Sequence, residues 1–162
     1  MTDALPGLMQ PTPLTIDSIF TRMETIYADG EIVSVDGRTT YGDLAHRVRR
    51  LATALVDEFG IRPGDRVASF AFNSARHMEL YFAAPLVGAV LHTVNVRLYA
   101  EQIAYIVNHA SDRVVFVDAE LVSALDDVAP KLDTVERYVR MGDGPATAPS
   151  IGALDDYDAL VA

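Results

Sequence analysis

Apolar residues in the first part of the chain recur at helical spacing. A stripe between residues 15 and 27 predicts a first helix, which Thr15 can cap. A second stripe predicts a helix from Thr40 to about Phe59, and Thr40 with Asp43 forms the capping box that opens it. The apolar positions of this second helix are Leu44, Val48, Leu51, Leu55 and Phe59.

Two short extended segments, 32–35 and 38–40, lie between these helices. They flank Asp36-Gly37, a dipeptide typical of two-residue hairpin turns, so they are predicted to pair as a β-hairpin. Residues 1–14 contain three prolines and no periodicity and are expected to form an extended N-terminal arm.

From Gly60 onward, short apolar strands alternate with helices. The strands are predicted at 67–70, 90–94, 114–117 and 135–139, and the helices at 73–87, 100–110 and 118–129. Such alternation is typical of parallel strands that are buried on both faces and joined by right-handed crossovers. The predicted fold class is therefore α/β: a doubly wound, mostly parallel sheet with flanking helices, plus an N-terminal β-hairpin.

The same pattern divides the chain into segments. We expect an α/β subdomain at 15–140, a flexible Gly/Pro linker at 141–150 and a short C-terminal helix at 151–162. Half of the residues are apolar and the mean hydropathy is +0.16, which is high for an isolated acidic domain. A sheet that continues into further strands would have this composition, so we expect the chain to be truncated.

Composition narrows the classes of function. The net charge is −10 and the pI about 4.6, which argues against binding of nucleic acid or an anionic membrane surface. The chain has no cysteine, which excludes disulfides, thiolate metal sites and cysteine nucleophiles. No apolar run approaches the ~20 residues of a transmembrane helix, and the N-terminus lacks the basic region of a signal peptide. A cytoplasmic location is therefore expected.

No complete phosphate-binding or metal-binding motif is present. Both GxGxxG and GxxxxGK[ST] are missing, and the glycines of residues 142–145 come without a basic residue, so a linker is preferred there to a phosphate loop. Asp155, Asp156 and Asp158 are interpreted as solvated residues at a helix start rather than as a cation site. The histidines lie on separate elements without metal-binding spacing: His46, His77, His92 and His109.

Candidate reactive side chains have structural explanations. Ser74 and His77 are close enough on one helix to touch, but they are interpreted as an N-cap and a surface residue. Asp118 ends a strand as a phospho-acceptor would, yet the acidic pair and the C-terminal lysine of a receiver domain are missing, because Lys131 precedes the last strand. We expect Asp118 to cap the following helix.

The loop at 95–98 lies at the carboxyl end of a strand, where ligands bind in open α/β sheets. Arg97 there either pairs with an anionic ligand or a neighbouring domain, or closes a structural ion pair, while Asn95 satisfies a turn. The structural interpretation is preferred. The residues alone therefore assign no catalytic, cofactor-binding or metal-ligating side chain.

Several segments nevertheless occur in a recognisable order. They are Gly60–Ala68, Asn73, Arg76–Phe82, Gly88–Asn95, Arg97–Leu98, Glu101–His109 and Asp112–Asp118. Together they resemble the N-terminal region of the adenylate-forming, AMP-dependent acyl-CoA synthetases, and most closely the medium- and long-chain fatty-acyl members. The resemblance covers about residues 15–140. It departs from the family at Val96, where many members have proline.

This resemblance implies an ATP-dependent fatty-acid–CoA ligase. In that family a carboxylate attacks the α-phosphate of Mg-ATP to give an acyl-adenylate, and the CoA thiol then displaces AMP to form the thioester. The family's Ser/Thr/Gly-rich phosphate loop, acidic ribose-binding residue and mobile-domain lysine have no match here, and Lys131 fits neither lysine role. No catalytic residue is therefore carried over.

The chain is accordingly expected to be an N-terminal portion that supports the acyl pocket and is inactive on its own. Fatty acid, ATP, Mg and CoA would be bound by the full enzyme, and none of the cofactors by this fragment. Exposed apolar surface is expected to favour homo-oligomers. The alternative is a stand-alone, non-catalytic α/β module for binding or assembly.

Overall fold

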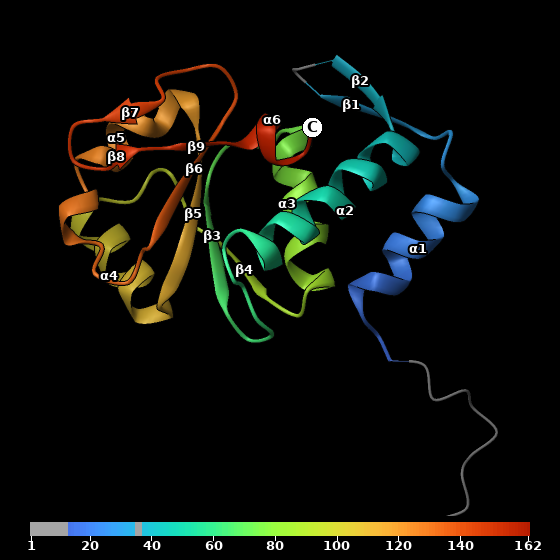
Figure 1. Ribbon diagram of the computed structural model, residues 1–162, viewed down its shortest axis with the longest axis horizontal. Coiled ribbons are helices and arrows are strands. Elements are labelled where there is room, and N and C mark those ends of the chain that lie inside the picture. The colour runs from blue at the N-terminus through green and yellow to red at the C-terminus, as the bar shows by residue number, and fades with distance from the viewer. Residues whose placement is uncertain (1–12, 35–36) are drawn as a thin grey trace, which may run out of the picture.

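A computed structural model describes residues 13–34 and 37–162 (Figure 1). The expected arm at 1–14 lies almost wholly outside the described residues, as does Asp36 of the expected turn. In chain order the helices and strands are α1 Ile16–Ile26, β1 Glu31–Ser34, β2 Gly37–Thr40, α2 Tyr41–Asp57, β3 Arg66–Phe70, α3 Ala75–Leu86, β4 Val90–Thr93, α4 Ala100–Ala110, β5 Asp112–Asp118, α5 Val122–Asp126, β6 Arg137–Met141, β7 Thr147–Ala148, β8 Gly152–Ala153, β9 Asp155–Asp156 and α6 Tyr157–Leu160.

The first helix and the hairpin form, with two departures from the prediction. Thr15 stands at the N-cap position of α1, but its side chain makes no capping hydrogen bond, so the expected cap is wrong. Gly37, which was predicted in the turn, lies in β2 opposite Ser34. β1 and β2 pair antiparallel, from Glu31 opposite Thr40 to Ser34 opposite Gly37. At the start of α2 the Thr40 hydroxyl accepts the backbone N–H of Asp43 at 3.0 Å, so the predicted cap is made.

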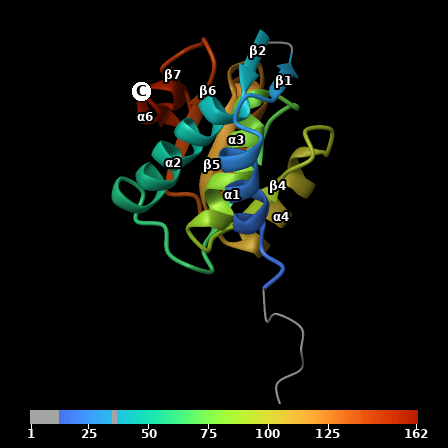
Figure 2. The same cartoon turned by 90° about the vertical axis from the view of Figure 1, so that its right-hand side faces the viewer.

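A sheet of five parallel strands forms the centre, in the order β4-β3-β5-β6-β9. The chain leaves β3 toward β4 on one side and then crosses to β5 on the other, so successive crossover helices lie on opposite faces. Residues of α2 and α3 pack on one face, and those of α4 and α5 on the other (Figures 1 and 2). The doubly wound sheet is thereby confirmed.

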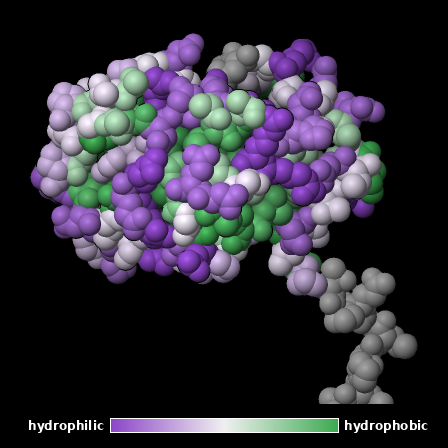
Figure 3. All heavy atoms as spheres, in the orientation of Figure 1, coloured by the Kyte–Doolittle hydropathy of each residue, from purple (hydrophilic) through white to green (hydrophobic). Residues whose placement is uncertain are grey.

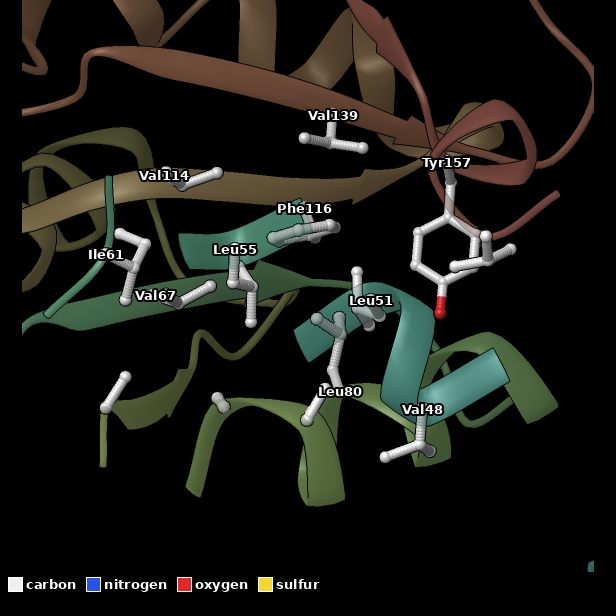
Figure 4. Close-up of a cluster of buried hydrophobic side chains, with 14 of the residues drawn as sticks. Val48, Leu51, Leu55, Ile61, Val67, Leu80, Val114, Phe116, Val139 and Tyr157 are labelled. Atoms are coloured by element: carbon white, nitrogen blue, oxygen red, sulfur yellow. The ribbon is translucent and has the colours of Figure 1, made fainter. Parts of the chain in front are cut away.

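The larger core cluster lies between the sheet and the pair α2–α3 (Figure 4). Alternate residues of β3 and β5, such as Val67 and Phe116, point into it and are fully buried. Phe116 meets the ring of Phe59 edge-on on one side and that of Tyr157 on the other, with centroids 6.4 and 6.1 Å apart. The C-terminal helix thus contributes to the same core as residues a hundred positions earlier.

The structure differs from the prediction mainly after β5. The last predicted strand, 135–139, is shifted to β6, because Val114 of β5 pairs with Arg137. The predicted helix over 118–129 is limited to α5 and short 3-10 turns on either side. In the segment expected as a linker, β7 forms and pairs antiparallel with β8. The helix expected over 151–162 is limited to α6, because β8 and β9 occupy its first part and β9 adds to the main sheet.

A buried carboxylate holds part of this C-terminal segment in a defined conformation. Asp126 at the end of α5 is 8% exposed and accepts the backbone N–H groups of Ser150 and Ile151, each at 2.8 Å. Asp126 is therefore a buried, hydrogen-bonded carboxylate and not a solvated one. Its side chain takes the place of a backbone partner and holds the β7–β8 turn against α5.

None of the helices in the described parts of the chain is long and apolar enough to cross a membrane.

Asp126→Ala should lower the free energy of unfolding by about 2–3 kcal/mol, because it leaves the part-buried N–H groups of Ser150 and Ile151 without their acceptor. Urea unfolding followed by circular dichroism measures the change. The neighbouring exposed carboxylate provides the control: Asp127→Ala should change the free energy of unfolding by less than about 0.5 kcal/mol. Equal losses in the two variants would contradict the assigned role of Asp126.

Candidate functional site

The strand order places a crevice at the carboxyl ends of β3, β5 and β6. This is the point where the winding of the sheet reverses, and ligands of open α/β sheets bind at such points. The crevice encloses about 330 Å³. It is lined by Phe72, Asn73, Ser74, Arg76, Asp118, Ala119, Glu120, Met141, Gly142 and Asp143.

Two side chains hold the backbone of Phe72 at the rim of the crevice. The backbone N–H of Phe72 donates to Asp118 Oδ2 at 2.6 Å, and its carbonyl oxygen lies 3.0 Å from His77 Nδ1. Asp118 stands at the N-cap position of the next 3-10 turn, but its side chain makes no capping hydrogen bond, so the expected capping role is wrong. Burial raises the pKa of Asp118, although the hydrogen bond from the Phe72 N–H acts in the opposite direction.

His77 is a core residue rather than the expected surface residue. It is 5% exposed, and its Nε2 lies 2.9 Å from the hydroxyl of Ser69, which is 1% exposed. Because the Phe72 carbonyl can only accept, Nδ1 carries the proton, and Nε2 then accepts from Ser69. The pair has the geometry of an activated hydroxyl, but burial of Ser69 removes it from any substrate. The predicted N-cap is confirmed: Ser74 Oγ accepts the His77 N–H at 3.1 Å.

A network of charges runs from the core to the crevice. Glu79, 3% exposed, accepts from Arg47 Nε at 2.7 Å and from the hydroxyl of Tyr157. Arg47 also donates to Asp158 at 3.0 Å, and Arg76 donates to the other oxygen of Asp158 at 2.9 Å. Burial and the adjacent Glu79 carboxylate raise the pKa of Tyr157 well above its ordinary value. Tyr157 is therefore a neutral hydrogen-bond donor at all physiological pH values.

The C-terminal aspartates are paired and not merely solvated, which corrects the expectation for them. Asp155 is bound by Arg137 at 2.6 Å, and Asp156 by Arg140. Asp156 also caps α6 through the N–H of Ala159. In the described ranges of the chain, no group of three or more His, Cys, Asp or Glu side chains is placed to hold a metal ion.

The charge of the crevice does not suit a phosphate. Among the described residues, Arg76 is the only lysine or arginine that lines it, and Asp158 neutralises its guanidinium. The other charged lining residues are acidic: Asp118, Glu120 and Asp143. A nucleotide triphosphate would therefore meet net negative charge here, so these residues do not fit the phosphates of ATP.

The other loops that the sequence marked show no phosphate site either. Gly142 has a positive φ of 89°, and the chain continues from 142–145 into β7 rather than into a helix. In the loop after β4, Asn95 Oδ1 accepts the Arg97 N–H at 3.0 Å, which is the predicted turn. Arg97 is exposed, and among the residues that the structure describes it forms no ion pair, contrary to the preferred structural interpretation.

Sequence reasoning missed Ser69, Glu79 and Tyr157. A signal for Glu79 existed, because it lies beside Leu80 and one turn before Ala83 on a helix whose buried face they define. A charge on that face indicates a buried partner. The partners themselves, Arg47 and Tyr157, come from distant parts of the chain and carry no local signal.

Comparison with known proteins agrees with the fold. A family model described as AMP-binding enzyme matches residues 23–159. A 3-methylmercaptopropionyl-CoA ligase of Ruegeria lacuscaerulensis is 40% identical over 161 residues, covering 96% of this chain and 30% of the relative. A long-chain-fatty-acid–CoA ligase of Thermus thermophilus is 40% identical over 144 residues, covering 86% of this chain and 26% of the relative.

Solved structures give the same result. A Mycobacterium tuberculosis fatty acyl CoA synthetase superposes with a TM-score of 0.72 at 28% identity, over 78% of this chain and 26% of that one. Coronafacic acid ligase of Pectobacterium brasiliense, at 16% identity, shares the fold with a TM-score of 0.80 over 91% of this chain and 29% of that one.

The class defined by this fold is thus the N-terminal α/β region of acyl-CoA ligases. The chain belongs to the AMP-binding enzyme family, which confirms the family resemblance noted in the sequence. It spans 30% and 26% of the lengths of these two relatives.

Asp158→Asn should make stability less sensitive to acid. Partial burial acts to raise the pKa of Asp158, but hydrogen bonds from Arg76 and Arg47 outweigh it, so its pKa in the folded chain lies below the ordinary 3.8. The stabilisation by the Asp158 carboxylate is therefore present at neutral pH and is lost as the pH falls through 3.8 toward the folded-state pKa.

Because Asp158 is 45% exposed, the substitution should cost less than about 1 kcal/mol at pH 7. Urea unfolding of both proteins across the acid range measures the difference, which should shrink as the pH falls. A difference that stays constant into strong acid would show that the Asp158 charge is not responsible.

Proposed function

We propose that this chain acts as the N-terminal part of an ATP-dependent fatty-acid–CoA ligase. The full enzyme would form an acyl-adenylate from a fatty acid and ATP, and then an acyl-CoA thioester with CoA. The observation that carries the proposal is the 40% identity to CoA ligases over nearly the whole chain. Its role in that enzyme is structural, as a rigid sheet beside the reaction centre, in the cytoplasm.

The reaction itself is assigned to residues outside this chain. The sequence contains no phosphate loop, and the crevice at the carboxyl ends of the strands carries net negative charge. The residues present therefore do not fit the phosphates of ATP, and no step of the reaction is routed through them. We propose that ATP, Mg and CoA bind only where the remaining parts of a ligase are present.

The purified chain should give no fatty-acid-dependent exchange of pyrophosphate into ATP, because its sequence contains no phosphate loop and its crevice carries net negative charge. The assay uses decanoate, Mg-ATP and labelled pyrophosphate, with a complete fatty-acid–CoA ligase as positive control. Exchange above the blank that depends on both decanoate and the chain would overturn the assignment of the chemistry to other residues.

An apolar groove supports a role beside the acyl chain. It runs between the β1–β2 hairpin and α3 and encloses about 620 Å³, with Val33, Met78 and Tyr81 among its lining residues. A second apolar groove of about 420 Å³ between α1 and α3 shares Met78 with the first. Val33 is 64% exposed and Tyr81 46%, so the groove presents apolar surface that a fatty-acid tail can cover.

Binding of decanoate should shift the Met78 methyl signal in a proton–carbon NMR spectrum, and Val33→Asp should weaken that binding about tenfold, because a carboxylate in the groove repels the acid and is costly to cover. Val56→Asp is the matched control, since Val56 is an exposed valine that lines a different apolar depression on α2. Equal weakening by both variants, or no shift of Met78, would exclude this groove as an acyl site.

Apolar surface is also visible elsewhere. In the view of Figure 3, hydrophobic side chains gather in the middle of the molecule, over α2 and α3. We propose that the chain forms homo-oligomers through exposed apolar surface.

A further inference from the structure

Three Asp-Gly pairs occur in the chain, at residues 29–30, 36–37 and 143–144. In such a pair the backbone nitrogen of the glycine can attack the carboxyl carbon of the aspartate side chain. Glycine allows this because it has no Cβ to shield the nitrogen, and because its backbone reaches conformations that other residues avoid. Asp36 lies outside the described residues. The other two pairs have the same chemistry but different surroundings, so they can be compared.

The pair Asp29-Gly30 is protected by its hydrogen bonds. The Gly30 N–H donates to the Tyr27 carbonyl at 2.8 Å, and the Gly30 carbonyl accepts the Tyr41 N–H at 2.9 Å. The backbone of Gly30 also packs closely on the Tyr41 ring, since a Cβ added there would lie 2.7 Å from a ring carbon. The nitrogen that would attack Asp29 is therefore engaged, and the residue that carries it is held on both sides.

The pair Asp143-Gly144 has no such protection. Both residues are exposed, in the bend between β6 and β7. Within the ranges that the structure describes, the Gly144 N–H has no acceptor, and the Asp143 carboxylate forms no ion pair. Arg140 donates to the Gly144 carbonyl oxygen, which belongs to the following peptide unit and leaves the nitrogen free. Both reacting groups of this pair are therefore available.

We propose that Asp143 is a site of spontaneous isomerisation to isoaspartate. The Gly144 nitrogen forms a bond to Cγ of Asp143, and the carboxyl hydroxyl leaves with the amide proton as water, which gives a five-membered succinimide. A water molecule then attacks the ring carbonyl next to Cα, and the bond from that carbon to the Gly144 nitrogen breaks. The main chain now runs through Cβ and Cγ, and the former backbone carbonyl is the free carboxylate. One water leaves and one enters, so the mass is unchanged.

The product would alter the rim of the crevice, which Asp143 and Ala119 both line. Gly144 packs tightly there, because a Cβ added to it would lie 2.9 Å from Cβ of Ala119. Isoaspartate lengthens the main chain ahead of Gly144 by one carbon and moves the carboxylate. Gly144 must then shift against Ala119, together with the carbonyl that Arg140 binds. The shape and charge of the crevice would therefore change as the protein ages, whatever reaction the full enzyme catalyses.

Peptide mapping tests the proposal on the purified chain, folded and in concentrated guanidinium chloride. Both samples are kept for several weeks at mildly acidic pH and physiological temperature, and a fresh sample gives the background. Tryptic peptide 141–162 contains Asp143, and peptide 23–38 contains Asp29 and Asp36. Reversed-phase chromatography separates the isoaspartyl form of each peptide, and electron-transfer fragmentation assigns the residue. Asp29 is the matched internal control, because it is also an exposed aspartate before glycine.

In the folded chain, Asp143 should accumulate at least about fivefold more isoaspartate than Asp29, since one ordinary hydrogen bond lowers the population of free Gly30 nitrogen by about this factor. In guanidinium chloride the two residues should react at similar rates. Equal rates in the folded chain, or no isoaspartate at Asp143 where the unfolded chain forms it, would overturn the proposal.

Asp143→Glu keeps the negative charge, but the same attack would have to close a less favourable six-membered ring. The isoaspartyl form of peptide 141–162 should therefore disappear in this variant. Its persistence would place the reaction at another aspartate of the peptide and would also overturn the proposal. Circular dichroism confirms that the variant is folded.

Discussion

The buried carboxylate of Glu79 requires hydrogen-bond partners, and this requirement determines how α2, α3 and α6 pack together. A charge in the core costs several kcal/mol unless it is paired and hydrogen-bonded. Arg47 from α2 and Tyr157 from α6 supply the partners, so α2, α3 and α6 are held in one arrangement. Asp158, which is bound by Arg47, also pairs with Arg76 at the crevice and neutralises the charge of the Arg76 guanidinium. The hydrogen-bond partners that the buried Glu79 requires thus leave the crevice without an unpaired positive charge from Arg76.

Local patterns were sufficient for the elements that form from their own residues. The Thr40 cap and α4 at Ala100–Ala110 appear as predicted, because their signals are contained within a few residues. The hairpin also forms, but its strands are β1 and β2 at 31–34 and 37–40 instead of 32–35 and 38–40. β6 was placed too early because Arg137 and Arg140 interrupt its apolar pattern. Both arginines are neutralised by Asp155 and Asp156 of β9. Pairing between strands some 16 residues apart produces no periodic pattern in the sequence, so β9 could not be predicted from it.

The crevice was less accessible to sequence reasoning than the fold. Its position follows from the strand order, which the alternation of strands and helices restricts but does not determine. Ser74 was identified correctly because a helix cap is a local feature. His77 was not, because its partners, Ser69 and the Phe72 carbonyl, belong to the preceding strand and loop and meet it only after α3 packs on the sheet.

The position of Tyr157 in the chain has a consequence for synthesis on the ribosome. Its ring is fully buried against Phe116, so the larger core has an unfilled site until α6 arrives. A nascent chain that has emerged only as far as β6 would expose the apolar ring of Phe116 and leave Glu79 without one of its donors. The chain therefore completes its folding late. A chaperone that binds apolar surface could bind the exposed Phe116 region until residue 157 has left the exit tunnel.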